Sequence, residues 1–296
     1  MGTFAAALVL TFCLSSVDAG DKPNYGFWTA AQLQEIEKKL NTTMDDNKGS
    51  HEDLMPTTHS YFMMIHREAT APKAEVHQKH GDFGYVRAGE GVVITGGNFV
   101  NGTPAGPNEM RGALEGGIRH PLSVGDAFYI PAAMPHQFVI EPGKTLTVEM
   151  LKVERKDGFQ DVPDLILNAK AHQMRTAKML KGKMDHFYTA NEDFIKNENI
   201  EMHQNHKEGS AESEIHQHFA EFQVILAGEG AMMLGGKVVN ARTVDSNEIR
   251  GTALKGAVRQ PLLPGDLIYI PPKTPHHTIV DRTKFQDKLI VKVWMP

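Results

Sequence analysis

The chain contains two copies of one sequence unit. Residues 85–91 match residues 224–230, which lie 139 positions later, and residues 125–131 match residues 265–271, which lie 140 positions later. A single inserted residue therefore separates two collinear copies. Solenoid repeats have periods of about 20–50 residues, so this longer period indicates tandem domains. The 296 residues are enough for two.

Short apolar runs within each copy are separated by Gly, Pro and Asn. In the second copy these runs lie at residues 222–226, 267–270 and 289–293. Such runs are typical of buried strands. Together with 27 Gly and 16 Pro, they predict an all-β fold of two barrels or sandwiches.

Helical spacing of apolar residues appears ahead of each copy, at residues 30–40 and 164–180. We expect short helices there that flank or join the barrels. The polar stretches at residues 41–58 and 196–214 are predicted to be loops, with the histidines of the second stretch in solvent.

The N-terminal residues 1–19 resemble a signal peptide. An apolar stretch at residues 4–14 is followed by small residues, and it is too short to span a membrane. The only cysteine, Cys13, lies inside it, so the mature chain would have no disulfide. With the glycosylation sequons at Asn41 and Asn101, this segment predicts a secreted, extracellular glycoprotein with no membrane segment after leader removal.

The composition excludes one class of partner and suggests a cofactor. Lys and Arg total 31 against 36 Asp and Glu, a net charge of -5, so no basic surface for nucleic acid is expected. Histidine is the commonest protein metal ligand, and the chain has 15 of them.

Four residues of the second copy are candidate metal ligands: His216, His218, Glu221 and His276. Alternate residues of a strand share a face, so His216 and His218 are predicted to converge on one centre. Glu221 would join them from the next strand, and His276 follows the apolar run at 267–270. Such a set leaves open positions on one divalent transition metal ion, iron or manganese first, with nickel, copper or zinc as alternatives.

These residues carry a family resemblance. His-x-His, a spacer, Glu221, six residues and Gly228, followed by the Gly-Asp-x-x-Tyr-Ile-Pro segment at 265–271 and then His276, resemble the two motifs of the cupin superfamily. With the duplication, the resemblance is to a bicupin, a protein with two cupin barrels. The resemblance implies tandem double-stranded β-helix, or jelly-roll, barrels with short flanking helices.

Two positions depart from the family pattern. The spacer between His218 and Glu221 has two residues where the family usually has three or four. Lys273 stands where the family usually has glycine.

The first copy aligns His77, Lys79, Asp82 and His136 with the four candidate ligands. A charged lysine has no lone pair for a metal, and His80 could replace Lys79 only through a register shift. We therefore expect a degenerate site with the weaker set His77, Asp82 and His136. This barrel would serve structure, dimer contacts or a ligand paired with Lys79.

Two further side chains are candidates for the pocket. Gln223 is in phase with Glu221 and is predicted to contact substrate. The motif Asn-Glu-x-Arg-Gly occurs twice, with Arg111 and Arg250. Arg250 could bind a substrate carboxylate, although an ion pair closing the long insert is the favoured interpretation.

The resemblance covers residues 60–155 and 200–296. The predicted division is a signal peptide at 1–19, an N-terminal helix and loop at 20–58, a first cupin domain at 59–155, a helical linker at 156–199, and a second cupin domain with the complete metal site at 200–296.

For function, the resemblance implies a secreted metal-dependent oxidoreductase of the dioxygenase type, acting on a small organic molecule in the second barrel. A manganese oxalate decarboxylase or oxidase is one alternative, although decarboxylases carry ligands in both barrels. A non-catalytic metal-binding or storage bicupin is another. The resemblance also makes a homodimer a candidate assembly.

Overall fold

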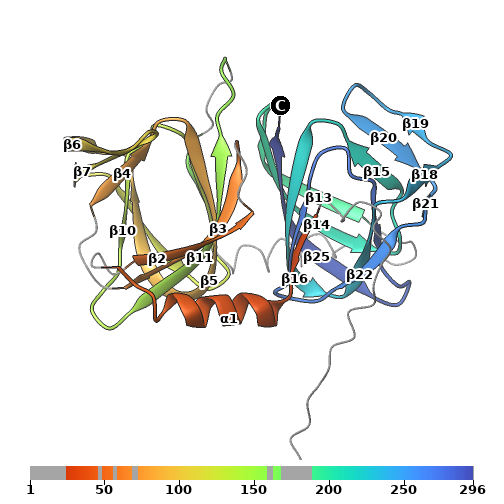
Figure 1. The fold of residues 1–296 in the computed structure, drawn as a ribbon, viewed down its shortest axis with the longest axis horizontal. Helices are drawn as coiled ribbons and strands as arrows, with labels where there is room; N and C mark the ends of the chain where they lie inside the picture. Colours follow the sequence, from red (N-terminus) through yellow and green to blue (C-terminus); the bar gives the residue numbers. More distant parts are fainter. Residues whose placement is uncertain are drawn as a thin grey trace, which may run out of the picture.

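Two β-barrels lie side by side in the molecule (Figure 1). A computed structural model describes residues 25–45, 49–55, 59–68, 73–158, 163–167 and 189–295. The predicted all-β fold of two tandem barrels is confirmed.

The first barrel contains β2 (Gly49–Met55), β3 (Tyr61–Glu68), β4 (Ala74–His77), β5 (His80–Thr95), β6 (Asn98–Gly106), β7 (Glu109–Glu115), β8 (Ile118–Ser123), β9 (Ala127–Ile130), β10 (His136–Val139), β11 (Thr145–Glu154) and β12 (Leu165–Leu167). The second contains β13 (Thr189–Lys196), β14 (Ile200–Glu208), β15 (Ser213–His216), β16 (Phe219–Gly228), β17 (Gly230–Leu234), β18 (Lys237–Val239), β19 (Arg242–Thr243), β20 (Glu248–Gly251), β21 (Ala253–Lys255), β22 (Val258–Leu262), β23 (Leu267–Ile270), β24 (His276–Ile279) and β25 (Phe285–Trp294), together with β1 (Gly26–Trp28).

Strand pairing repeats between the barrels at corresponding positions. In the first barrel β5 pairs with β9 so that Asp82 lies opposite Ile130, and in the second β16 pairs with β23 so that Glu221 lies opposite Ile270. The sequence repeat is therefore a repeat of three-dimensional structure, and one barrel can serve as the reference for the other.

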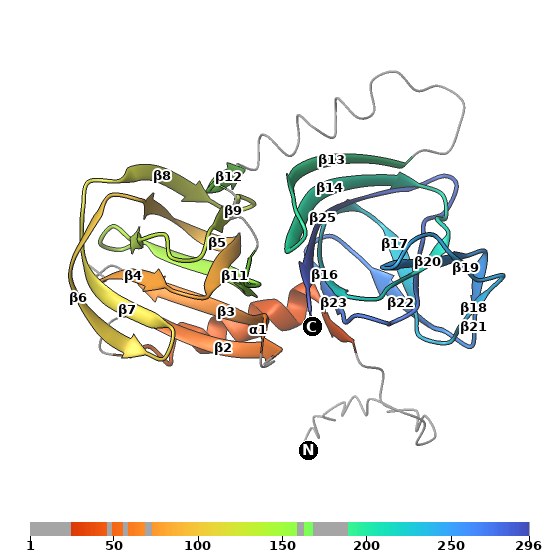
Figure 2. The ribbon, with the colours of Figure 1, turned by 90° about the horizontal axis from the view of Figure 1, so that it is seen from above.

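Each barrel receives a strand that precedes the other barrel in the chain. β1 pairs with β23, with Gly26 opposite Tyr269, and β12 pairs with β9, with Leu165 opposite Tyr129. Figure 2 shows β12 beside β9 and the N-terminal strand reaching toward β23. β1 therefore connects the start of the chain to the second barrel, whereas β12 stays with the first barrel that it follows in the chain.

The structure corrects part of the expected secondary structure. The helix predicted at 30–40 is confirmed as α1 (Ala30–Leu40), with Thr29 as its N-cap. The helix predicted at 164–180 is wrong at its start, because the apolar residues 165–167 form β12 and pair with β9. Residues 168–180 lie outside the described residues. The predicted loops at 41–58 and 196–214 contain β2 and β14, because long-range pairing with β3 and β25 outweighs their polar composition.

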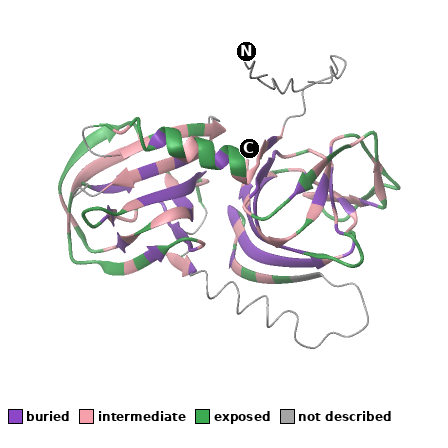
Figure 3. Ribbon diagram, turned by 90° about the horizontal axis from the view of Figure 1, so that it is seen from below, coloured by how far each residue is buried: buried purple, intermediate pink, exposed green. Residues whose placement is uncertain are grey.

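One hydrophobic core extends across both barrels. Phe62 of β3 contacts Phe222 of β16 with ring centroids 5.3 Å apart, and Trp28 packs against Phe62 at 5.9 Å. Leu33 and Leu40 of α1 are buried in the same core. Figure 3 shows buried strands facing one another between the barrels, and in Figure 1 α1 runs below the first barrel toward the second.

A glycine of the cupin motif is required by the backbone. Gly89 and Gly228 have φ angles of 76° and 70°. A Cβ at these positions would lie 1.9 Å from the Thr145 carbonyl oxygen and 2.0 Å from the Phe285 carbonyl oxygen. Only glycine therefore fits where β5 and β16 bend beside β11 and β25.

The departure at Lys273 has a measurable cost. Lys273 has a φ of 63°, in the left-handed region, while its backbone N–H donates to the His216 carbonyl at 2.7 Å. Glycine keeps that bond without the Cβ penalty, so Lys273→Gly should raise the free energy of unfolding by about 1 kcal/mol. Urea denaturation measures the change. As a control, Lys237→Gly at an exposed strand position with ordinary φ should lower stability; a loss of stability in Lys273→Gly would contradict the argument.

The predicted leader at residues 1–19 lies outside the described residues. Within the described part of the chain, no helix is both long and apolar enough to cross a bilayer.

Candidate metal centres

Each barrel gathers two histidines and two carboxylates in its interior. In the second barrel they are Glu214 and His216 of β15, Glu221 of β16 and His276 of β24. Glu214, His216 and His276 each place one nitrogen or oxygen atom within 4.8 Å of the others, and Glu221 lies 2.8 Å from His216 Nε2. These are donor types that bind transition metals.

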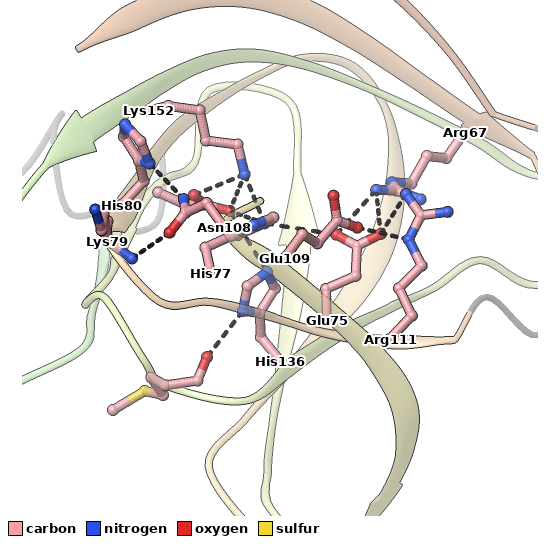
Figure 4. Close-up of polar contacts among 12 residues, drawn as sticks. Arg67, Glu75, His77, Lys79, His80, Asn108, Glu109, Arg111, His136 and Lys152 are labelled. Carbon is pink, nitrogen blue, oxygen red and sulfur yellow. Dashed lines mark hydrogen bonds and ion pairs between the residues drawn. The ribbon is translucent and has the colours of Figure 1, made fainter. Parts of the chain in front are cut away.

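The first barrel contains the repeat-equivalent set. Glu75 and His77 come from β4 and His136 comes from β10 (Figure 4). Asp82 comes from β5. Asp82 Oδ2 lies 3.5 Å from His77 Nε2 and 3.4 Å from His136 Nε2. Both barrels thus present the same four positions.

This geometry corrects the register of the predicted ligand set. His218 is exposed in the turn after β15, and the residue that shares a face with His216 is Glu214. With Glu214-x-His216, the spacer before Glu221 has four residues, which is a usual cupin length. The irregular two-residue spacer was the signal in the sequence that could have shown this.

The same shift changes the interpretation of the first barrel. Lys79 is equivalent to His218 and is likewise exposed, so it replaces none of the four clustered side chains. His80 lies outside the cluster, with Nε2 3.1 Å from the His59 carbonyl oxygen. The expected degeneracy therefore loses its basis, because Glu75 supplies the fourth side chain.

One histidine of each set is oriented with a free lone pair. The Nδ1–H of His136 donates to the Met134 carbonyl at 3.0 Å, and that of His276 donates to the Thr274 carbonyl at 2.9 Å. Both Nε2 atoms are buried and have no hydrogen-bond partner among the described residues. A lone pair and carboxylate oxygens that face one another in a buried site are stabilised when a cation lies between them.

A lysine ammonium already lies beside each cluster, and sequence reasoning missed it. Lys152 Nζ donates to both Asp82 oxygens at 2.7 Å and to His77 Nε2 at 2.8 Å. Lys292 Nζ lies 2.9 Å from Glu221 Oε1 and 2.9 Å from His216 Nε2. The available signal was a lysine at the same repeat position in two strands whose flanking residues are apolar.

The repeated Asn-Glu-x-Arg-Gly motif supports these clusters from β7 and β20. Glu248 Oε2 accepts a hydrogen bond from His216 Nδ1 at 2.6 Å, and Arg250 lies 2.7 Å from Glu248 and 3.2 Å from Glu214. Arg111 lies 2.5 Å from Glu109 in the first barrel. The favoured ion-pair interpretation of Arg250 thus fits, although its side chain is 37 % exposed at the pocket rim.

Electrostatics differ between the two clusters. Burial lowers the pKa of His77 to about 4, so its ring is neutral at pH 7. Burial would also lower the pKa of His216, but the carboxylates of Glu221 and Glu248 raise it to about 9. Burial alone would raise the pKa of Glu221, but Lys292 and His216 hold it well below its ordinary value. A metal ion in the second cluster would therefore replace a proton on His216 Nε2.

A pocket opens onto each cluster. The second barrel has a pocket of about 500 Å³ that is lined by Glu214, His216, Glu221 and Lys292, and the first has one of about 360 Å³. Both volumes fall in the range of small-molecule sites, roughly 300–1,000 Å³.

Two histidines of the second barrel lie deeper than the sequence indicated, while Gln223 faces the barrel interior as expected. Gln223 is buried in the pocket wall and its Nε2 donates to Glu221 Oε2 at 2.6 Å. His203, expected in solvent, is buried on β14 and lines the pocket. His206, also expected in solvent, is buried with Nδ1 2.6 Å from Asp287.

Comparison with known proteins finds similarity in structure. No protein-family model and no curated protein matches the sequence. A cupin 2 conserved barrel protein from Leptotrichia buccalis is 13% identical and has a TM-score of 0.51, with 87% of this chain and 94% of that chain covered. The salicylate 1,2-dioxygenase from Pseudaminobacter salicylatoxidans is 10% identical and has a TM-score of 0.62, with 95% and 87% covered. A variant of that dioxygenase in complex with gentisate is 11% identical, with a TM-score of 0.61 and with 95% and 84% covered.

These similarities extend over both barrels, and at such low identity they concern the fold. They agree with the two tandem barrels that the strand pairing shows. On these grounds the chain has the fold of two-barrel cupin proteins.

Proposed function

We propose that this protein is a metal-dependent cupin enzyme of the oxygenase type that acts on a small organic molecule. The observation that carries the proposal is the pair of buried Nε2 atoms of His136 and His276. They make no hydrogen bond among the described residues, although carboxylate oxygens lie 3.4 Å and 3.5 Å away. Each is held by a backbone carbonyl so that its lone pair faces carboxylates, which is the arrangement that second-layer hydrogen bonds give to metal-ligating histidines.

The residues of the second barrel would have separate tasks. Glu214, His216, Glu221 and His276 would hold the ion, and Glu248 would keep His216 oriented through its Nδ1–H. Iron or manganese would supply Lewis acidity and redox chemistry toward the substrate. Gln223, Lys292 and Arg250 line the same pocket and would contact the substrate or hold protons beside it.

The oxygenase assignment draws support from the salicylate 1,2-dioxygenase likeness, one example of which contains gentisate. A single cupin fold supports many reactions, so the reaction must be tested on the protein itself. Oxygen consumption with a panel of phenols, diketones and oxalate distinguishes a dioxygenase from an oxalate oxidase, and carbon dioxide release from oxalate detects a decarboxylase. Secretion and a homodimer also remain predictions.

A second candidate is a metal-free binding protein in which Lys152 and Lys292 act as permanent counter-ions. The observation that favours it is the set of short contacts from each ammonium to the clustered carboxylate and histidine. An ammonium so placed neutralises the buried charge without a metal.

Metal content decides between the two candidates. The chain, stripped with a chelator, incubated with excess Mn²⁺ or Fe²⁺ and dialysed, should retain two ions because both barrels hold an equivalent cluster. His136→Ala and His276→Ala should each lose one ion, since each removes a ligand from one barrel. Mass-spectrometric metal analysis measures both.

His218→Ala is the matched control and should keep both ions, because His218 is exposed outside the cluster. Failure of the wild-type protein to retain any ion would favour the metal-free candidate. If the wild-type protein retained one ion and only His276→Ala lost it, the result would support the expectation from sequence that the first barrel has a degenerate site.

A further inference from the structure

The interiors of the two barrels differ at three repeat-equivalent positions that touch one another in space. The first barrel has Val148, Gly84 and Phe138, and its interior is apolar there. The second barrel has Lys288, Gln223 and Thr278 at the matching registers. These three substitutions together build one polar group of side chains in the second barrel alone.

Lys288 is the centre of this polar group. It is 1% exposed, and its Nζ donates to Gln223 Oε1 at 3.0 Å and to Thr278 Oγ1 at 3.1 Å. Within the described part of the chain, no carboxylate lies within ion-pair distance of this amine. Lys292, in contrast, contacts Glu221 directly. Lys288 is therefore a buried amine with two hydrogen-bond acceptors and no ion-pair partner.

This environment favours the neutral amine. Burial lowers the pKa of Lys288 to about 7, and the positive charge of Lys207 on β14 adds to the effect. Three other charged groups act on the pKa of Lys288. The carboxylates of Glu221 and Glu214 raise it, and the ammonium of Lys292 lowers it. Compared with a solvent lysine of pKa about 10.4, a much larger fraction of Lys288 is therefore neutral at pH 7.

A neutral amine at this place has its remaining lone pair available. Two N–H bonds point to Gln223 and Thr278, and the side chains of all three residues line the pocket of about 500 Å³. Desolvation next to another cation is a known way in which proteins make lysine nucleophilic.

We propose that Lys288 is an amine nucleophile that captures the carbonyl group of a small aldehyde or ketone in the second barrel. The lone pair of Nζ forms a bond to the carbonyl carbon as the C=O π bond breaks, and one of the two N–H protons passes to the carbonyl oxygen to give a carbinolamine. Loss of the hydroxyl with one amine proton releases water and leaves an imine. No oxidant or reductant is consumed, and the step reverses with water.

The inference shares its pocket with the proposed function but needs no metal, so the two can fail separately. The chelator-treated protein is incubated at pH 7 with acetaldehyde as the probe and sodium cyanoborohydride as the reductant. Hydride transfer from cyanoborohydride converts any imine to a stable secondary amine. Peptide mapping by mass spectrometry then identifies which lysines are ethylated.

In the wild-type protein, ethylation at Lys288 should exceed that at the exposed Lys237 and Lys284 by at least about tenfold at early times, given the difference in neutral fraction. Equal or lower labelling at Lys288 would overturn the proposal, and this comparison needs no variant. Lys288→Val introduces the residue of the first barrel and should remove the fast-labelling site without changing ethylation at Lys237. Lys207→Met should still form the adduct at Lys288, but several times more slowly, because the variant lacks the positive charge that lowers the pKa of Lys288. An unchanged or faster rate would show that Lys207 does not activate Lys288.

Discussion

Lys292→Met should bind a divalent transition metal in the second barrel about 100-fold more tightly than the wild-type protein. The Lys292 ammonium contacts both Glu221 and His216, so a metal ion must displace it or bind beside a positive charge. Two unit charges 4 Å apart interact by about 4 kcal/mol at an effective dielectric constant of about 20, and the metal carries twice that charge. A gain of roughly 3 kcal/mol is therefore a conservative expectation.

Without metal, Lys292→Met should be less stable than the wild-type protein. Removing the ammonium leaves the buried Glu221 without its principal cation, which costs about 3–5 kcal/mol when one partner of a buried pair is lost. Isothermal titration with Mn²⁺ and thermal unfolding with and without metal measure the two effects. Lys152→Met should likewise tighten metal binding in the first barrel and lower the stability of the metal-free protein. The exposed Lys284→Met should change neither quantity. Weaker metal binding in Lys292→Met would mean that the lysine assists the ion.

Phe222→Ala should lower the free energy of unfolding by about 3–5 kcal/mol, as large-to-small changes at buried aromatic positions do. Phe222 is buried and its ring contacts Phe62 of the other barrel at 5.3 Å and Tyr269 at 4.7 Å. Because this core is shared, both barrels should lose stability together, and the loss is measured by urea denaturation with hydrogen exchange resolved by barrel.

The matched control is Phe285→Ala. Phe285 is the same residue type in the second barrel but is 40% exposed, so its loss should cost less than about 1 kcal/mol. If Phe222→Ala lowered the protection of β16 and left β3 of the first barrel unchanged, the barrels would be independently stable and the shared core would contribute little to their union.

Much of the site could be predicted from the sequence, because the local pattern of a strand specifies which residues share a face. Period-two alternation and motif spacing predicted that His216, Glu221 and His276 lie close together, and they do. His218 was misplaced because β15 ends at His216, and alternation says nothing beyond the end of a strand. The correct partner, Glu214, lies two residues earlier in the same strand.

The sequence by itself determined the all-β class, the cupin motifs and the helix at 30–40, since each depends on residues that are close together in the chain. It also determined the duplication, since comparing two segments of one sequence needs no structure. The tertiary structure alone decided the features that depend on distant pairing. The apolar triplet of β12 became a strand because the edge of β9 was available to it. Lys152 and Lys292 became the cations of the two clusters because β11 and β25 lie against β5 and β16. Local propensity cannot report such contacts, because their free energy comes from groups that meet only once the barrels have closed.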